Sequence, residues 1–158
     1  MKALVTTIGS DKKREKKLVT DWPDAPEPVG NQVKVKTLYT AITNGTERND
    51  LICGNYARPD TKLPAPRGYQ NIGEVIAVGD NVQSYKIGDV VFSSSDHLEY
   101  ATFAEDWLTV KVPNNISCEE ASLFGLAAIA VRTCRNSELM IGEKVLIIGA
   151  GILGLLAG

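Results

Sequence analysis

Residues 68–91, GYQNIGEVIAVGDNVQSYKIGDVV, carry the most regular pattern in this chain of 158 residues. Runs rich in Val and Ile at Asn71–Val78 and Asp89–Phe92 predict two strands. Between them, Gly79-Asp80-Asn81 and Gly88-Asp89 supply residues that tolerate positive φ where the chain must reverse. The stretch therefore predicts consecutive strands joined by tight turns.

The same alternation of short strands and turns extends from residue 1 to about residue 112. Further strands are predicted at Ala3–Thr7, Gln32–Thr40, Glu99–Phe103 and Leu108–Val112. Three prolines within residues 22–28, and Pro59, Pro64 and Pro66 later in the chain, argue against central strands and mark connecting loops. Many short strands separated by glycine and proline predict a mainly β (α+β) fold, built as a small barrel or a sandwich.

A helical pattern begins at Ser117. Ser117 and Glu120 form a capping box, in which each side chain satisfies a free amide at the helix start. Apolar residues at Ala121, Phe124 and Val131 then recur at helical spacing. We therefore divide the chain into a β domain at 1–116, a linking helix at 117–140 and a third segment at 141–158.

The third segment reads as the start of a nucleotide-binding unit. Residues 144–148 are a nearly continuous apolar run, typical of a strand buried in a parallel sheet. In the glycine motif that follows, the first glycine permits a tight turn, the second lets the backbone approach a pyrophosphate and the third allows close packing of helix on strand. The predicted cofactor-binding residues are Gly149, Gly151, Ile152, Leu153 and Gly154. The alternative is a plain strand–turn–helix connection without a ligand.

Composition excludes several classes of partner. The net charge is −2, which favours neither nucleic acid nor an anionic membrane. The basic cluster at residues 12–17 contains Glu15 and predicts a solvated turn or the start of a strand. The sequence shows no signal peptide and no apolar run long enough to span a membrane. Three widely spaced cysteines fit reduced thiols, so we expect a cytoplasmic location.

The order of several motifs resembles the medium-chain dehydrogenase/reductase superfamily, whose zinc-type alcohol dehydrogenases have a GroES-like domain before a Rossmann domain. The motifs that carry the resemblance are Gly45-Thr46-Glu47, residues 68–75, Val78-Gly79, residues 88–91, Glu99-Tyr100-Ala101, Pro113, Glu119-Glu120-Ala121 and residues 142–154. The resemblance implies a GroES-like, partly open β-barrel, a linking helix and the truncated start of a Rossmann βαβ unit.

The resemblance also implies a function. The chain would be the N-terminal catalytic-domain portion of an NAD(P)-dependent oxidoreductase that acts by hydride transfer on a small alcohol, polyol or carbonyl compound, and it would be inactive alone. The full-length protein would associate as a homo-oligomer. The residue that distinguishes NAD from NADP lies beyond Gly158, so this choice stays open. An enoyl or quinone reductase of the same superfamily is an alternative, as is a stand-alone GroES-like binding or assembly module.

The departures from the family pattern concern zinc. Where zinc-using members keep a cysteine, a histidine and a third ligand on the linking helix, this chain has Asn44, Tyr69 and Leu126–Ala128. Zinc requires Cys, His or carboxylate donors, so we expect no catalytic zinc. The four-cysteine lobe that holds a structural zinc is also absent, because the chain has three cysteines. Members without zinc are therefore the nearest match.

Without a metal, a side chain must stabilise the oxygen that gains charge in hydride transfer. Tyr69 is the first candidate donor and Asn44 the second, while Thr46 stands where relatives keep a proton-relay hydroxyl. Glu47 could shuttle a proton if burial raised its pKa. The alternatives are that Tyr69 fills the space of the lost ligand and bonds a backbone carbonyl, and that Asn44–Thr46 form a turn and cap before a helix at Glu47–Cys53.

His97 is the only histidine of the chain. It follows Ser93-Ser94-Ser95-Asp96, a stretch typical of a loop, which we expect near the substrate entrance. Asp96 or Glu99 could orient the imidazole as a catalytic base. The alternative is a solvated surface histidine.

Overall fold

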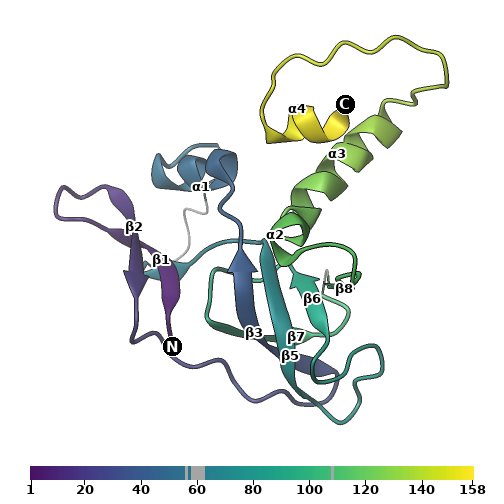
Figure 1. Cartoon of the computed structure of the whole chain (residues 1–158). Helices are drawn as coiled ribbons and strands as arrows, with labels where there is room; N and C mark the ends of the chain where they lie inside the picture. Colours follow the sequence, from purple (N-terminus) through teal and green to yellow (C-terminus); the bar gives the residue numbers. More distant parts are fainter. Residues whose placement is uncertain (56, 58–62, 108) are drawn as a thin grey trace. The chain divides into compact units, whose positions relative to one another are not determined.

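The computed structural model describes residues 1–55, 57, 63–107 and 109–158. It divides into two compact units, Met1–Ser122 and Leu123–Gly158, and each is described by itself (Figure 1). Within the described residues, the first unit contains the β strands and the helices α1 (Asn44–Leu51) and α2 (Cys118–Ala121). The second contains α3 (Phe124–Asn136) and α4 (Ile152–Ala157).

A small antiparallel sheet has the strand order β2-β1-β4, from Arg14–Val19, Ala3–Ile8 and Ala65–Pro66. Lys12 and Lys13 of the basic cluster lie in the turn before β2 and residues 14–17 lie in the strand, so the prediction of a turn or the start of a strand is confirmed. The register of β2 pairs Lys16 with Thr6 of β1. Pro66 was predicted to lie in a loop, but it belongs to the two-residue edge strand β4, a position that does not require its missing N–H. Pro59 lies outside the described residues.

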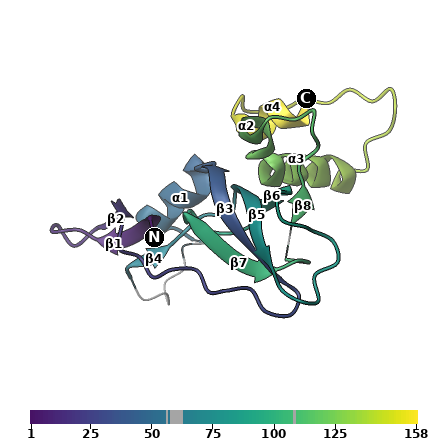
Figure 2. The ribbon, with the colours of Figure 1, turned by 60° about the horizontal axis from the view of Figure 1, so that its bottom comes forward.

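The larger antiparallel sheet has the order β7-β3-β5-β6-β8. Its strands are Tyr100–Ala104, Gln32–Thr40, Asn71–Val78, Val90–Ser93 and Val110–Lys111. The predicted strands are confirmed, β3 and β5 with the predicted bounds, although Leu108 lies outside the described residues. Alternate side chains of this sheet form the core, with Val33, Val35, Val75, Val91, Ala101 and Phe103 buried together. Figure 2 shows the five-stranded sheet beside the small sheet, in a mainly β fold.

The capping box at the end of the first unit is confirmed, because Ser117 Oγ accepts a hydrogen bond from the Glu120 amide at 3.2 Å and Glu120 accepts one from the Ser117 amide at 3.0 Å. The helix that it opens is shorter than predicted. Helix α2 ends at Ala121, where the Ser122 hydroxyl donates to the Glu119 carbonyl at 2.6 Å. Helix α3 starts again at Phe124 and ends at Asn136.

In the second unit, the prediction of a strand at residues 144–148 is wrong. A β-strand requires hydrogen bonds from a neighbouring strand. Among the residues that the structure describes, none pairs with residues 144–148, so they form no strand. The predicted turn and helix after them are present: Gly149 has φ 109° and α4 begins at Ile152. In the described part of the chain, no helix is long and apolar enough to cross a membrane.

Candidate functional site

Helix α1 places several predicted residues around its first turn. It begins at Asn44 with Thr43 as N-cap, and the Glu47 carboxylate accepts a hydrogen bond from the Thr43 amide at 2.9 Å. Asn44, Gly45 and Thr46 therefore form the first helical turn, and the prediction that they precede a helix starting at Glu47 is wrong. The reason is that the long side chain of Glu47 caps the helix from within. Asn44 and Thr46 remain exposed at its start.

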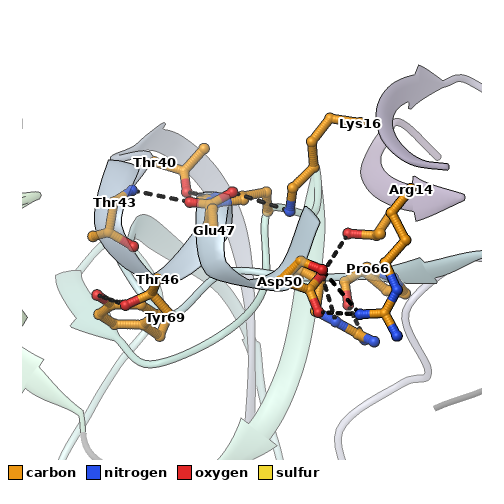
Figure 3. Close-up of polar contacts among 12 residues, drawn as sticks. Arg14, Lys16, Thr40, Thr43, Thr46, Glu47, Asp50, Pro66 and Tyr69 are labelled. Carbon is orange, nitrogen blue, oxygen red and sulfur yellow. Dashed lines mark hydrogen bonds and ion pairs between the residues drawn. The ribbon is translucent and has the colours of Figure 1, made fainter. Parts of the chain in front are cut away.

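The structure brings together two of the predicted catalytic side chains. The Tyr69 hydroxyl lies 3.3 Å from the Thr46 hydroxyl, and either can donate the hydrogen bond (Figure 3). Tyr69 comes from the segment between β4 and β5 and is half-buried, whereas Thr46 comes from α1. The pairing of two hydroxyls differs from the alternative in which Tyr69 bonds a backbone carbonyl. It leaves the second hydrogen-bonding position of the phenol for another group.

Tyr69 also lines a cavity of about 520 Å³ within the first unit. The wall combines aromatic rings with hydroxyl and carboxylate groups, among them Trp22, Tyr100, Trp107, Ser94, Ser95 and Asp96. Asp24 adds a second carboxylate, and among the described lining residues there is no lysine or arginine. A volume of this size suits a small organic molecule.

His97 is buried within its loop, so the alternative of a solvated surface histidine is wrong, while Ser94, Ser95 and Asp96 of the same loop line the cavity that Tyr69 lines. The residue is 3% exposed, and its Nε2 lies 3.0 Å from Oε1 of Glu47 while its Nδ1 contacts the Thr40 hydroxyl. Glu99 does not orient it, because that carboxylate accepts the Lys2 amide at 2.7 Å. The loop turns inward because the His97 carbonyl accepts the Leu4 amide at 2.9 Å, which fastens it to β1.

The Glu47 carboxyl is an ionised group in a buried position. Its Oε2 lies 3.0 Å from the Lys16 ammonium, and the Glu47 side chain is 7% exposed. Burial alone would raise the pKa of Glu47, but His97, the Lys16 ammonium and the Thr43 amide stabilise the carboxylate and hold the pKa below its ordinary value. The condition for a proton shuttle, a raised pKa, is therefore not met.

A second buried carboxylate follows one turn later on α1. Asp50 pairs with Arg14 at 2.8 Å and with Arg67 at 3.6 Å, and it accepts the Thr6 hydroxyl at 3.0 Å. Figure 3 shows Asp50 beside Arg14 and Glu47 beside Lys16. Sequence analysis missed this cluster. The available signal was the i, i+3 spacing of the two acids on a helix, opposite basic residues at alternate positions of a strand.

The positions where zinc-using relatives keep their ligands do not fit zinc. Asn44 offers an amide and Tyr69 a phenol, neither of which belongs to the usual zinc donor set. Leu126, Ala127 and Ala128 lie on α3 in the second unit and carry no donor atoms. Elsewhere in the described residues, no three His, Cys, Asp or Glu side chains gather as a metal site.

The predicted cofactor residues lie at the turn before α4. A Cβ on residue 154 would come within 2.0 Å of the Gly149 carbonyl oxygen, so this close approach requires glycine. A Cβ on residue 151 would meet nothing within 4 Å, which leaves the backbone open at the helix start. Ile152 and Leu153 form the first turn of α4. This geometry is compatible with a bound pyrophosphate.

The two antiparallel sheets and the site at the start of α1 define a GroES-like β domain. The family model for the alcohol dehydrogenase GroES-like domain matches residues 30–114, more than half of the chain. The chain belongs to this family, and through it to the medium-chain dehydrogenase/reductase superfamily.

The individual proteins that the chain resembles include a dehydrogenase matched in sequence and two oxidoreductases matched in structure. L-threonine 3-dehydrogenase of Photorhabdus laumondii is 31% identical over 85% of this chain and 48% of its own length. The crystal structure of 2R,3R-butanediol dehydrogenase from Bacillus subtilis superposes with a TM-score of 0.81 at 23% identity, covering 99% of this chain and 53% of that one. The quinone oxidoreductase of Coxiella burnetii gives 0.77 at 25% identity, with 99% and 51% covered. The chain spans about half the length of the curated relatives that it matches.

Proposed function

We propose that this chain is the N-terminal catalytic-domain portion of an NAD(P)-dependent, alcohol dehydrogenase-like oxidoreductase that works without zinc. The observation that carries the proposal is Tyr69, which lines a cavity of about 520 Å³ and whose hydroxyl is paired with the Thr46 hydroxyl at 3.3 Å. The phenol stands where zinc-using relatives keep a histidine ligand. Family membership supports the reaction class, and the lack of zinc donors supports the metal-free mechanism.

In this mechanism Tyr69 polarises the substrate oxygen. When hydride reaches a carbonyl carbon, negative charge develops on the oxygen, and a fixed donor at hydrogen-bond distance stabilises that charge. Tyr69 donates its single O–H to this oxygen, and the Thr46 hydroxyl donates to the phenol oxygen through their shared hydrogen bond. Asn44, exposed in the same helical turn as Thr46, is the second donor. In the oxidation direction the alcohol proton passes to the Tyr69 oxygen, the phenol proton passes to Thr46, and the proton of the exposed Thr46 hydroxyl passes to water.

The nicotinamide cofactor supplies or accepts the hydride when it is bound. Gly149, Gly151 and Gly154, with Ile152 and Leu153, would hold its pyrophosphate, because the open backbone at residue 151 leaves room for an anion beside the helix start.

The cavity favours a neutral substrate with several hydroxyl groups. The Met1 ammonium at the cavity wall is paired with Asp24 at 3.0 Å, and Asp96 adds a second carboxylate, so the wall favours a neutral ligand over a phosphate or carboxylate. Ser94, Ser95 and the carboxylates can pair with hydroxyls, and the aromatic rings can cover an aliphatic chain. We therefore propose a small alcohol, diol or polyol and the corresponding carbonyl compound. A location in the cytoplasm and association into a homo-oligomer stay predictions.

The test uses the complete protein. Purified enzyme is assayed with NAD and NADP against neutral diols and polyols, sugar phosphates and amino acids, and its metal content is measured. Cofactor-linked oxidation of a neutral hydroxylated substrate, without stoichiometric zinc, supports the proposal. One tightly held zinc per chain, or activity confined to anionic substrates, would contradict it.

A second candidate is an enoyl or quinone reductase. The observation in its favour is the structural match to the quinone oxidoreductase of Coxiella burnetii, with a TM-score of 0.77 at 25% identity. A hydrogen-bond donor such as Tyr69 could equally stabilise the enolate oxygen formed when hydride reaches the β carbon of an enone. NAD(P)H-dependent reduction of enones or quinones, without oxidation of alcohols, would select this candidate.

A further inference from the structure

We propose that His97 is a positioning residue, which fixes the segment Arg67–Gln70 and thereby the hydroxyl of Tyr69, and that it takes no proton from a substrate. The consequence for catalysis rests on the proposed role of Tyr69, whereas the positioning itself is a property of the fold.

Both ring nitrogens of His97 are occupied. Nε2 lies 3.0 Å from Oε1 of Glu47, and because an ionised carboxylate can only accept, Nε2 carries a proton and donates it. Nδ1 lies against the Thr40 hydroxyl. His97 is 3% exposed and borders a cavity of about 460 Å³, but both ring nitrogens are engaged by Glu47 and Thr40. To take a proton from a substrate, the ring would have to give up one of these two partners.

The imidazole ring instead supports the segment that carries Tyr69. A Cβ on residue 68 would lie 2.8 Å from three ring atoms of His97, and Gly68 has φ +140°, so the backbone passes directly over the ring as only glycine allows. The His97 amide donates to the Arg67 carbonyl at 3.1 Å. On the other side of Tyr69, the Thr40 hydroxyl contacts both the ring and, at 2.8 Å, the Gln70 carbonyl.

The same contacts connect the Tyr69 segment to α1 at two points. Thr46 is hydrogen-bonded to the Tyr69 hydroxyl, and the next residue, Glu47, is hydrogen-bonded to His97, whose ring packs against Gly68. Glu47 is itself fixed by Lys16 at 3.0 Å, so the partner of His97 has a defined position. A displacement of about 1 Å in a catalytic group can cost about 100-fold in rate. Contacts of His97 that fix the position of Tyr69 therefore matter for the rate of the reaction.

The state of the ring can be measured directly in the full 158-residue chain, because it contains a single histidine. Nitrogen-15 NMR of uniformly labelled protein at neutral pH is expected to show a proton on Nε2 that exchanges slowly with water. An unprotonated Nε2, or a ring N–H that exchanges as fast as in the urea-unfolded chain, would overturn the proposal. This measurement requires no substitution, so it does not depend on the folding of a variant.

The consequence for Tyr69 is tested with tyrosines labelled at the Cζ carbon, the Tyr69 signal being the one that Tyr69→Phe removes. His97→Leu fills the site without a donor, and we expect the Tyr69 signal to move to its position in the unfolded chain. His97→Gln retains an amide donor for Glu47, and we expect the native signal to persist. An unmoved Tyr69 signal in His97→Leu, or equal displacement in both variants, would refute the inference.

These spectra are independent of activity. If Tyr69→Phe leaves the complete protein fully active, the proposed function fails, but the Nε2 proton and the Tyr69 signal of the native chain stay as predicted. If the spectra differ from expectation while Tyr69→Phe abolishes activity, the positioning role fails and the proposed function stands.

Discussion

Replacing Glu47 by glutamine tests whether the carboxylate under α1 is a structural anion. Its Oε2 lies 3.0 Å from Lys16 and its Oε1 lies 3.0 Å from His97 and 2.9 Å from the Thr43 amide. Removing one partner of a buried ion pair costs about 3–5 kcal/mol of unfolding free energy. Because glutamine can still accept from the Thr43 amide and the Lys16 side chain is 17% exposed, we expect about 3 kcal/mol, at the lower end of that range.

Glu27→Gln is the matched control. Glu27 also pairs with a lysine, Lys34, at 2.6 Å, but its side chain is 79% exposed, so the same substitution is expected to cost about 0.2–1 kcal/mol. Urea unfolding followed by tryptophan fluorescence reports the first unit, because both tryptophans of the chain, Trp22 and Trp107, belong to it. Equal stability of the two variants would refute the assignment of Glu47 as a buried, paired anion.

The effect depends on pH in a defined direction. Since the folded protein holds the pKa of Glu47 below its ordinary value of about 4.3, the carboxylate stabilises the fold fully above that value. As the pH falls through the lowered pKa, this stabilisation is lost. The difference in stability between the wild type and Glu47→Gln is therefore expected to be constant near neutral pH and to shrink in acid. A difference that grows as the pH falls would contradict the sign of the shift.

Three further predictions concern the complete protein. Tyr69→Phe is expected to lower kcat by about 100- to 1,000-fold with unchanged cofactor affinity. Tyr39→Phe, at an exposed tyrosine that does not line the cavity, is the control and is expected to retain activity. Equal rates of the two variants in steady-state assays would contradict the role of Tyr69. Gly154→Ala is expected to disrupt the turn before α4, because its Cβ would come within 2.0 Å of the Gly149 oxygen, and limited proteolysis would detect the disruption. Gly151→Ala is expected to retain the fold, because its Cβ meets nothing within 4 Å, and to weaken NAD(P)H binding in fluorescence titrations. Dialysis against a zinc chelator is expected to leave the activity unchanged. Loss of activity on dialysis that added zinc restores would contradict the proposal that the enzyme works without zinc.

Local pattern predicted much of the fold. Strands β3 and β5 have the bounds expected from their runs of apolar residues, and the capping box at Ser117 and Glu120 forms as expected. These features depend on residues that are neighbours in the sequence, so the sequence displays their cause directly. The glycine turn at Gly149 belongs to the same class, because a positive φ is a property of one residue.

The candidate site was predicted in part. The motif resemblance located Thr46 and Tyr69, which the structure joins by a hydrogen bond. For His97 the acidic residues nearby in the sequence were the predicted partners, whereas the actual partner, Glu47, lies 50 positions earlier in the chain. The burial of that pair follows from the packing of loop against helix, and the pKa of Glu47 is lowered by the partners His97, Lys16 and Thr43 that the packing brings to it.

The sequence by itself determined the strands of the β domain, the capping box at Ser117 and the family membership of this chain, because these depend on residue type at short separation. Only the tertiary structure decided that the basic residues of β2 face two helical carboxylates, that His97 is enclosed, and that residues 144–148 adopt no ladder. The physical reason is common to all three. Ion pairs, burial and strand pairing require a second partner, and the identity of that partner is set by how distant segments meet in the folded chain.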